Sequence, residues 1–421
     1  MDDRKPSFQS GLVHKIIIVS QYYKPENFVI NTISERLAAR GHDVKVLTGM
    51  PNYPHGRVFS GYRGFAPRRD KHDSIEVVRV PLIPRGRAKG LRLALNYLSF
   101  AVSATLAVPF LWKKADVVFV FQPSPVTVGL PALAVKWLSG IPIVFWVQDL
   151  WPESLAATGA TRNQAIIGRV RSFVRFLYRR SDIIAISSRA FEEKILTLAP
   201  GSDVRYLPNP ANPEPEKSSP SGPSEAGFPE GFRILFTGNF GVAQGLETVL
   251  EAAKQTRHLQ HIKWILAGDG RQRAALRSRI DLDGLQDTVA MVGPFPAHAM
   301  PALLEQADAL LVTLRRDPLF ALTVPSKLQT YLAAGRPILA ATDGETARIV
   351  EEARAGYSCP AGDAAALARA AIRLSELDAP ARQAMGEAGR SYYSREFALD
   401  HIVERLENWF DELLGKRACA S

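Results

Sequence analysis

The sequence has 421 residues, more than one hydrophobic core usually serves, so its length favours two domains. Hydrophobic residues make up 46% and charged residues 22%, as in an ordinary globular protein. The two cysteines, Cys359 and Cys419, exclude a disulfide framework and a cysteine-based zinc site, which fits a reducing compartment.

Positive charge is concentrated in the first half of the chain. The formal net charge is +10 overall, +14 over residues 1–200 and −4 over residues 201–421. The densest basic segment runs from Arg57 to Arg92 and holds ten basic residues against three acidic ones. This asymmetry predicts an anionic partner, either nucleic acid, a phosphoinositide-like lipid or the inner leaflet of a membrane. The alternative is a basic surface that serves solubility.

The first half shows a repeated strand–helix pattern. The N-terminal segment, MDDRKPSFQSGLVHK, has no apolar run typical of a secretory signal. After it, strands are expected at 15–20, 44–47, 115–121, 141–147 and 181–187, with helices around 33–38, over 128–138 and from 189 onward. Short strands without alternation, interleaved with helices, predict a doubly wound parallel sheet.

A change of composition divides the chain. Residues 208–229 are rich in Pro and Ser and nearly free of apolar residues, so we interpret them as a linker. A second β-α series begins directly after it. The predicted architecture is therefore α/β, with Rossmann-like domains over 1–207 and 230–395 and a C-terminal helix over 396–421 packed back on the first domain. Ligands of open α/β sheets bind beyond the carboxyl ends of the strands, so the predicted active site is a central cleft that the two domains face.

Residues 91–112, LRLALNYLSFAVSATLAVPFLW, form a nearly charge-free stretch between basic residues. Its length reaches the transmembrane range, but Asn96 and Pro109 weaken that interpretation. We predict a crossover helix of the first domain that offers one face to a membrane surface. An ordinary buried helix and a true span are the alternatives.

Two stretches of the second domain indicate an anion site. In FTGNFGVAQGL, residues 236–246, a strand ends at Gly238 and a helix opens after Gly245, which presents free backbone N–H groups; the glycine spacing matches neither a Walker loop nor a dinucleotide fingerprint. In VPSKLQTYLAAG, residues 324–335, Ser326 is a candidate N-cap. Lys327 lies in the first turn, where a cation is unfavourable unless an anion is bound nearby.

Together these motifs resemble a known family. PNYPHG, VQDLWPES, LPNP, GNFGVAQGL, AGDG and VPSKLQTYLAAGRPIL are similar to motifs of the family-4 glycosyltransferases of the GT-B fold. Within them the chain resembles the bacterial branch that adds fucose-like or N-acetylated amino sugars to exopolysaccharide and O-antigen. The resemblance covers residues 15–410. It implies a nucleotide-sugar donor in the second domain, an acceptor in the first, retention of the anomeric configuration, and neither a metal nor a cofactor.

The resemblance also assigns donor-binding residues. They lie in the glycine-rich loop, in the turn beside the nucleoside and before the helix that faces the diphosphate: Gly238, Asn239, Gly241, Gln244, Gly268, Gly270, Leu322, Thr323, Val324, Ser326 and Lys327. The chain departs from the family at four of its charged positions, which here are Asn239, Gln244, Leu322 and Thr330. We therefore expect Lys327, or else Arg315 or Arg316, to supply the cation. An apolar Leu322 or Phe320 would suit a deoxy or N-acetyl sugar.

The first domain offers acids at strand ends. Asp149 is the first candidate for binding the transferred sugar or for catalysis, and Glu153 is another, with helix capping as its alternative. Glu26 is a candidate acceptor-binding residue or base, with a solvated loop acid as its alternative. Contacts to acceptor or sugar are expected from Asn27, Asn52, Tyr53, Gln148 and Trp151.

The predicted function is transfer of a sugar from a UDP or GDP donor to a polyprenyl-diphosphate-linked saccharide. The enzyme is expected on the cytoplasmic face of the inner membrane, held to its anionic surface through residues 57–114. The alternatives are a metal-independent nucleotide-sugar epimerase and a non-catalytic nucleotide-sugar-binding protein. A nicotinamide dehydrogenase is disfavoured because no Gly-x-Gly-x-x-Gly follows the first strand of either domain. Nucleic acid is disfavoured because the basic residues accompany no recognisable nucleic-acid module.

Overall fold

The computed structural model describes residues 12–64, 66–86, 90–110, 115–157, 161, 163–211 and 228–420. These residues form two compact units. The first contains the chain up to Ser187, Phe191–Pro208 and the segment from Leu399 onward, and the second contains Ser188–Ala190 and Asn209–Ala398. Most of the predicted linker, residues 212–227, lies outside the described residues.

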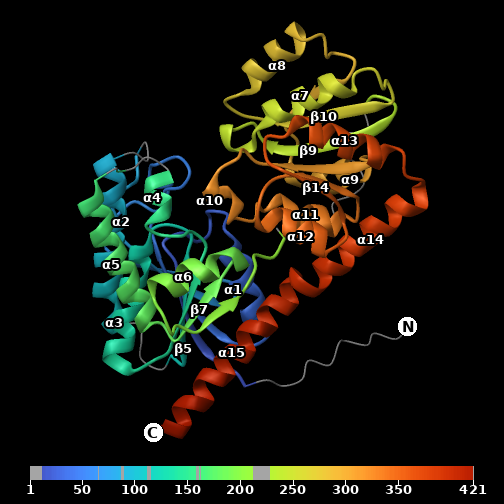
Figure 1. Ribbon diagram of the computed structural model, residues 1–421. Helices are drawn as coiled ribbons and strands as arrows, with labels where there is room; N and C mark the ends of the chain where they lie inside the picture. The colour runs from blue at the N-terminus through green and yellow to red at the C-terminus, as the bar shows by residue number, and fades with distance from the viewer. Residues whose placement is uncertain are drawn as a thin grey trace. The chain divides into compact units, whose positions relative to one another are not determined.

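The first unit is built on an eight-stranded sheet in the order β3-β4-β2-β1-β5-β6-β7-β8 (Figure 1). The strands are β1 (Lys15–Val19), β2 (Asp43–Gly49), β3 (Arg68–His72), β4 (Ile75–Val80), β5 (Val117–Gln122), β6 (Ile143–Val147), β7 (Ile183–Ile186) and β8 (Val204–Tyr206). All neighbours pair in parallel except β3 and β4. Strands β5 and β6 are buried at every residue, which explains their unbroken apolar runs.

Helices cover both faces of this sheet. They are α1 (Val29–Ala39), α2 (Gly90–Ala107), α3 (Gly129–Ser139), α4 (Glu153–Ala157), α5 (Gln164–Arg180), α6 (Glu192–Leu198) and α15 (Leu399–Ala420), with short 3₁₀ turns at Val108–Phe110 and Val126–Val128. A further 3₁₀ turn, Arg189–Phe191, has its first two residues in the second unit and its last in the first. Helices α2, α3 and α5 lie together on one side of the sheet in Figure 1. The C-terminal helix α15 belongs to this unit: Phe410 is fully buried in the same core as Phe119, and Glu407 pairs with Arg40 at 2.7 Å.

The second unit has a six-stranded parallel sheet in the order β11-β10-β9-β12-β13-β14. Its strands are β9 (Phe232–Asn239), β10 (Ile262–Asp269), β11 (Val289–Val292), β12 (Ala309–Thr313), β13 (Ile338–Ala341) and β14 (Gly356–Cys359). Its helices are α7 (Leu246–Thr256), α8 (Arg273–Leu282), α9 (Met300–Glu305), α10 (Pro318–Ala321), α11 (Lys327–Ala334), α12 (Glu345–Glu352), α13 (Ala364–Ser375) and α14 (Ala379–Glu396), with 3₁₀ turns at Val242–Gln244 and Ala297–Ala299. Two hydrophobic clusters bury this sheet, one containing Trp264 and the other Tyr331. Both units are therefore parallel α/β folds, as predicted.

Part of the basic segment of the first unit has a structural role. Residues 68–80 form the antiparallel pair β3–β4, which the sequence pattern did not reveal. Within it, the fully buried Arg79 donates from Nε to Asp70 at 2.7 Å and from Nη2 to the carbonyl of Lys24 at 2.5 Å. Arg68 also donates to Asp70, at 2.6 Å. These pairs neutralise charge that the sequence analysis assigned to an anionic partner.

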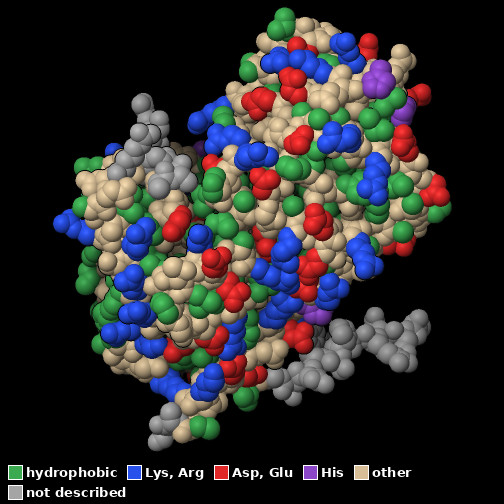
Figure 2. All heavy atoms as spheres, viewed as in Figure 1, with side chains coloured by type: hydrophobic (Ala, Val, Ile, Leu, Met, Phe, Trp, Pro, Cys, Tyr) green, Lys and Arg blue, Asp and Glu red, His purple; other side chains and the backbone are tan. Residues whose placement is uncertain are grey.

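Helix α2 has a packed face and an exposed apolar face. Among the described residues, the segment Gly90–Phe110 is the one long and apolar enough to cross a membrane by length and composition. Its inner face is nevertheless buried in the first unit through Asn96, Phe100 and Ala104. Its outer face exposes large side chains: Leu91, Leu95, Leu98, Val102 and Leu106. Figure 2 shows hydrophobic and basic side chains side by side on the surface of this unit.

Candidate active site

The parallel strands of the first unit bring its candidate residues to one edge of the sheet. Because β1, β2, β5 and β6 run in the same direction, the loops that follow them begin at the same edge. Glu26 follows β1, Asn52 and Tyr53 follow β2, and Asp149 follows β6. The candidates for sugar and acceptor contacts therefore share this edge.

Glu26 is turned into the unit. Its side chain is only 3% exposed, and Oε1 accepts hydrogen bonds from the backbone N–H groups of Asn52 at 2.8 Å and Tyr53 at 2.7 Å. Oε2 accepts a longer bond, 3.3 Å, from the N–H of Tyr23. Burial raises the pKa of Glu26 to about 7, although these three hydrogen bonds act in the opposite direction. The alternative of a solvated loop acid is wrong, and Glu26 fastens the loop after β1 to the loop after β2.

The other predicted acceptor contacts of these loops differ in exposure. Asn52 is fully buried, donates from Nδ2 to the carbonyl of Met50 at 3.1 Å and accepts at Oδ1 from the N–H of Arg85 at 3.1 Å. Tyr53 is 39% exposed, and Asn27 is exposed as well. Asn52 therefore shapes the loop from inside, while Tyr53 and Asn27 reach the surface.

The residues after β6 face different surroundings. Trp146 is fully buried and donates from Nε1 to the carbonyl of Leu207 at 2.8 Å, so it packs within the unit. Gln148 and Asp149 are partly buried, and burial raises the pKa of Asp149 to about 6. A carboxyl group whose pKa lies near neutrality can exchange a proton at physiological pH, so Asp149 is suited to acid–base chemistry or to a hydrogen bond with a sugar hydroxyl.

Trp151 and Glu153 line a separate pocket of the first unit. It has a volume of about 370 Å³ and lies between the loop after β6 and helices α5 and α6. Its cationic lining residues are Arg171, Arg175 and Lys194. Glu153 is also the first residue of α4, where a negative charge is favourable, and its capping role stays a prediction. Asp149 does not line this pocket, so the residues of the motif VQDLWPES lie in two different surroundings within the unit.

Glycines shape the loops of the second unit. Strands β9 and β10 pair in parallel so that Gly238 lies opposite Gly268. A Cβ at position 268 would lie 1.9 Å from the carbonyl oxygen of Gly238, and Gly268 also has a φ of +152°. A side chain at 268 would therefore separate the two strand ends. The predicted donor residues Gly238 and Asn239 are exposed at this edge, Gly241 and Gln244 are partly buried in the loop that leads into α7, and Gly270 is partly buried after β10.

Lys327 lies under the glycine-rich loop. Its Nζ donates to Oε1 of Gln244 at 2.6 Å and lies 3.8 Å from the ring centroid of Phe236. A Cβ at Gly238 would be 3.5 Å from the same Nζ. Burial lowers the pKa of Lys327 to about 7. Among the described residues no carboxylate forms an ion pair with it, so its charge is available to a bound anion.

The remaining predicted donor residues surround the start of α11. Ser326 occupies the N-cap position of this helix, as predicted, but its side chain makes no capping hydrogen bond and its backbone already has helical dihedral angles. Leu322, Thr323 and Val324 are partly buried in the segment before it. The alternative cations already have partners: Arg315 lies 3.4 Å from Asp317 and Arg316 lies 3.7 Å from Asp343. Lys327 is thus the cation best placed for the loop.

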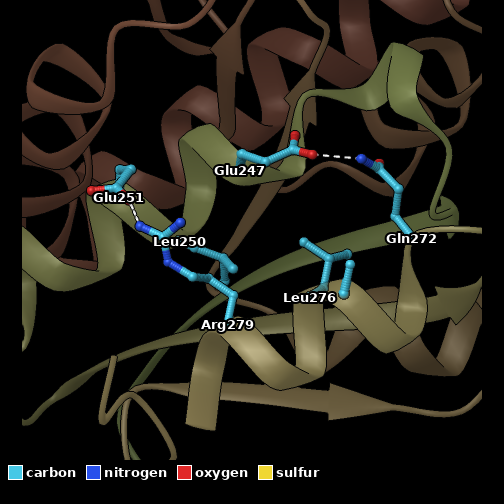
Figure 3. A pocket seen from close by; sticks show the side chains of 7 residues that line it. Glu247, Leu250, Glu251, Gln272, Leu276 and Arg279 are labelled. Atoms are coloured by element: carbon cyan, nitrogen blue, oxygen red, sulfur yellow. Dashed lines mark hydrogen bonds and ion pairs between the residues drawn. The ribbon is translucent and has the colours of Figure 1, made fainter. Parts of the chain in front are cut away.

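The second unit has another pocket, and none of the predicted donor residues lines it. Figure 3 shows it between α7 and α8, with a volume of about 230 Å³. Its polar side chains bond to one another: Arg279 donates to Glu251 at 2.7 Å, and Gln272 donates to Glu247 at 2.5 Å. Over the described residues no group of three or more His, Cys, Asp or Glu side chains could hold a metal ion.

Two family models match the two units. The model described as "Glycosyl transferase 4-like domain" matches residues 27–210, and "Glycosyl transferases group 1" matches residues 231–376. The probable glycosyltransferase WbjE of Pseudomonas aeruginosa is 30% identical over 72% of this chain and 76% of its own length. The putative colanic acid biosynthesis glycosyl transferase WcaI of Escherichia coli is 28% identical over 76% of this chain and 81% of its own length.

Solved structures share the fold. Sucrose-phosphate synthase from Thermosynechococcus elongatus has a TM-score of 0.69 at 19% identity and covers 95% of this chain and 99% of its own. HepE from Anabaena, in complex with UDP, has a TM-score of 0.68 at 16% identity, over 94% of this chain and 100% of its own. Two parallel α/β units with these neighbours define a GT-B fold. The chain belongs to the family-4 glycosyltransferases, as the two family models and the identity to WbjE show.

Sequence reasoning overlooked one group of side chains at the carboxyl edge of the first sheet. Tyr22 and Phe28 stack on each other and contact Tyr53, and the guanidinium of Arg85 lies over two of these rings. The aromatic residues of QYYKPENF were a signal for such a group. Arg85 could not have been singled out among the ten basic residues of its segment without the structure.

Proposed function

We propose that this glycosyltransferase transfers a sugar from a UDP or GDP donor to a polyprenyl-diphosphate-linked saccharide during surface polysaccharide synthesis. The observation that carries the donor half of the proposal is Lys327, a partly buried lysine without a carboxylate partner under the loop that contains Gly238 and Gln244. A diphosphate is the kind of anion that such a loop and a nearby helix start accommodate. The HepE structure, solved with UDP, supports a uridine nucleotide as the first donor to test.

The proposed chemistry retains the anomeric configuration and needs no metal. Negative charge develops on the leaving diphosphate, and Lys327 together with the backbone N–H groups at the start of α11 would stabilise that charge. Asp149 is the proposed sugar-binding or acid–base residue of the first unit. The similarity to WcaI, a putative colanic acid biosynthesis glycosyl transferase, supports a polysaccharide role.

We also propose that the enzyme binds the cytoplasmic face of the inner membrane through α2 and the basic residues near it. The outer face of α2 is apolar, and Leu91 and Leu106 are 76% and 69% exposed. Large exposed apolar side chains next to basic ones suit the interface of an anionic bilayer. Flotation with vesicles of phosphatidylglycerol and phosphatidylcholine tests this; a protein that stays out of the lipid layer at every salt concentration would contradict it.

One experiment separates the proposed function from its alternatives. Purified protein is screened for thermal stabilisation by UDP and GDP sugars, and the best donor is then incubated with and without a lipid-diphosphate-linked saccharide. A transferase forms a new glycoside only when the acceptor is present. An epimerase would convert the donor sugar without any acceptor, and a binding protein would be stabilised by a donor that it leaves unchanged.

A further inference from the structure

An aromatic platform lies at the carboxyl edge of the first sheet. The rings of Tyr22 and Phe28 stack with centroids 4.9 Å apart and an interplanar angle of 11°. The ring of Tyr53 leans on both, at 5.8 Å from Tyr22 and 5.3 Å from Phe28. The three side chains come from the loops after β1 and β2, so the platform exists only because those two loops are held together.

Arg85 covers this platform with an unpaired charge. Its guanidinium carbon lies 5.0 Å from the ring centroid of Tyr53 and 6.0 Å from that of Tyr22. Its Nε is buried and has no hydrogen-bond partner, and among the described residues no carboxylate pairs with it. The nearby Arg79, in contrast, has both Asp70 and the carbonyl of Lys24 as partners. A guanidinium with five donors and no acceptor in the protein is suited to an anionic ligand.

The position of Arg85 is fixed by its backbone. Its N–H donates to Oδ1 of the buried Asn52 at 3.1 Å, and the N–H of Asn52 donates in turn to Glu26 at 2.8 Å. The segment just before Arg85 is tied to α2, because Asn96 donates to the carbonyl of Ile83 at 2.6 Å. Arg85 is thus held over the aromatic platform, and Glu26 acts on it through Asn52 as a positioning residue.

We propose that Arg85 binds the phosphate groups of the lipid-linked acceptor, while Tyr53, the exposed ring of the platform, packs against an adjoining part of that acceptor. This rests on the proposed function and deepens it. In a polyprenyl-diphosphate-linked saccharide the diphosphate stands between an apolar chain and a sugar. The first unit carries the same three kinds of group: the outer face of α2 is apolar, Arg85 is cationic, and the exposed ring of Tyr53 beneath Arg85 suits the C–H groups of a sugar. An anionic phospholipid headgroup offers the same phosphate chemistry, so the test separates the two sources.

The test compares two acceptors in detergent solution that differ only in their anchor. One carries the saccharide on a short-chain lipid diphosphate, and the other carries it on an uncharged alkyl group of equal length. For Arg85→Ala we expect the KM for the diphosphate acceptor to rise about tenfold to a hundredfold, the range for losing a hydrogen-bonded charge pair. The KM for the alkyl glycoside and for the donor should stay unchanged. Arg85→Lys keeps the charge but not the fork of donors and should give an intermediate rise.

A control variant and a folding measurement show whether a change in KM is specific to Arg85. Arg277→Ala removes one exposed arginine from α8 of the second unit and should change none of these constants. Thermal unfolding of each variant reports whether it folds, and Arg85→Lys remains informative if the alanine variant does not. If the wild-type enzyme glycosylates neither acceptor, the proposed function itself fails.

Two results would overturn the role of Arg85 while the proposed function stands. The first is an active enzyme whose preference for the diphosphate acceptor survives in Arg85→Ala. The second is a variant with unchanged KM values in detergent but weaker binding to vesicles that contain phosphatidylglycerol, which would assign Arg85 to membrane headgroups instead.

Discussion

The lowered pKa of Lys327 makes donor binding dependent on pH. Burial shifts this pKa from 10.5 to about 7, so near neutrality a large part of the free enzyme carries an uncharged amine at this position. A bound diphosphate favours the ammonium form, because it places negative charge beside Nζ. The enzyme must therefore take up a proton when the donor binds above neutral pH, and the donor affinity should fall as the pH rises through 7.

The size of this effect follows from the fraction of protonated lysine. With a pKa of about 7, the apparent Kd scales as one plus the ratio of neutral to charged lysine, which is about 1.1 at about pH 6 and about 11 at about pH 8. The donor affinity should thus fall about tenfold over this interval, or about 1.4 kcal/mol. The diphosphate of a nucleotide sugar does not itself titrate in this range, so the change reports on the protein.

Isothermal titration calorimetry with a UDP sugar at these pH values measures both quantities. Buffers with different ionisation enthalpies give the number of protons taken up, which should approach one above neutrality. Lys327→Met keeps an apolar stem but no charge, and it should bind the donor weakly with no dependence on pH. The reasoning would be refuted by a wild-type affinity that is flat over this range, or by a Lys327→Met variant with the same slope as the wild type.

Three further predictions concern the first unit. Because the pKa of Glu26 is raised to about 7, the folded chain holds more protons than the unfolded chain between about pH 4.5 and 7. The free energy of unfolding, measured by urea titration, should therefore fall by about 3 kcal/mol as the pH rises across that window. Glu26→Gln should remove this dependence on pH. The paired change Leu98→Asp with Val102→Asp should abolish vesicle flotation, whereas Leu282→Asp, at a still more exposed position of α8, should leave it intact; equal flotation of both would argue against α2. Asp149→Asn should lower the rate of transfer about a hundredfold or more without weakening donor binding, and an unchanged rate would remove Asp149 from the site.

The sheets could be predicted from the sequence because their central strands are buried on both faces. The run of β6 contains no polar residue, and that of β5 contains only Gln122 at its end, so the pattern is clear. The edge strand β3, RRDKH, has no apolar residue, so nothing in its composition indicated a strand. Helix α5 was also missed, although Val174, Leu177 and Tyr178 are buried at helical spacing, because five arginines interrupt its apolar pattern.

The sequence predicted the candidate site only in outline, through the residues that follow the carboxyl ends of strands. Lys327 was identified because a cation at a helix start is unfavourable by itself, which is a local signal. Glu26 points inward because it binds backbone N–H groups in the loop after another strand, β2. Arg85 lies over the aromatic rings because three separate loops come together there. Such arrangements arise from tertiary packing, and no local pattern encodes them.

Following the sugar itself tests the proposed reaction most directly. Purified enzyme is incubated with radiolabelled UDP and GDP sugars and a polyprenyl-diphosphate-linked saccharide, and the mixture is then partitioned between butanol and water. We expect label from one donor to enter the butanol phase only when both the enzyme and the lipid-linked acceptor are present. Label that stays in the water phase for every donor, including donors that bind the enzyme, would contradict the proposed transfer to a lipid-linked saccharide.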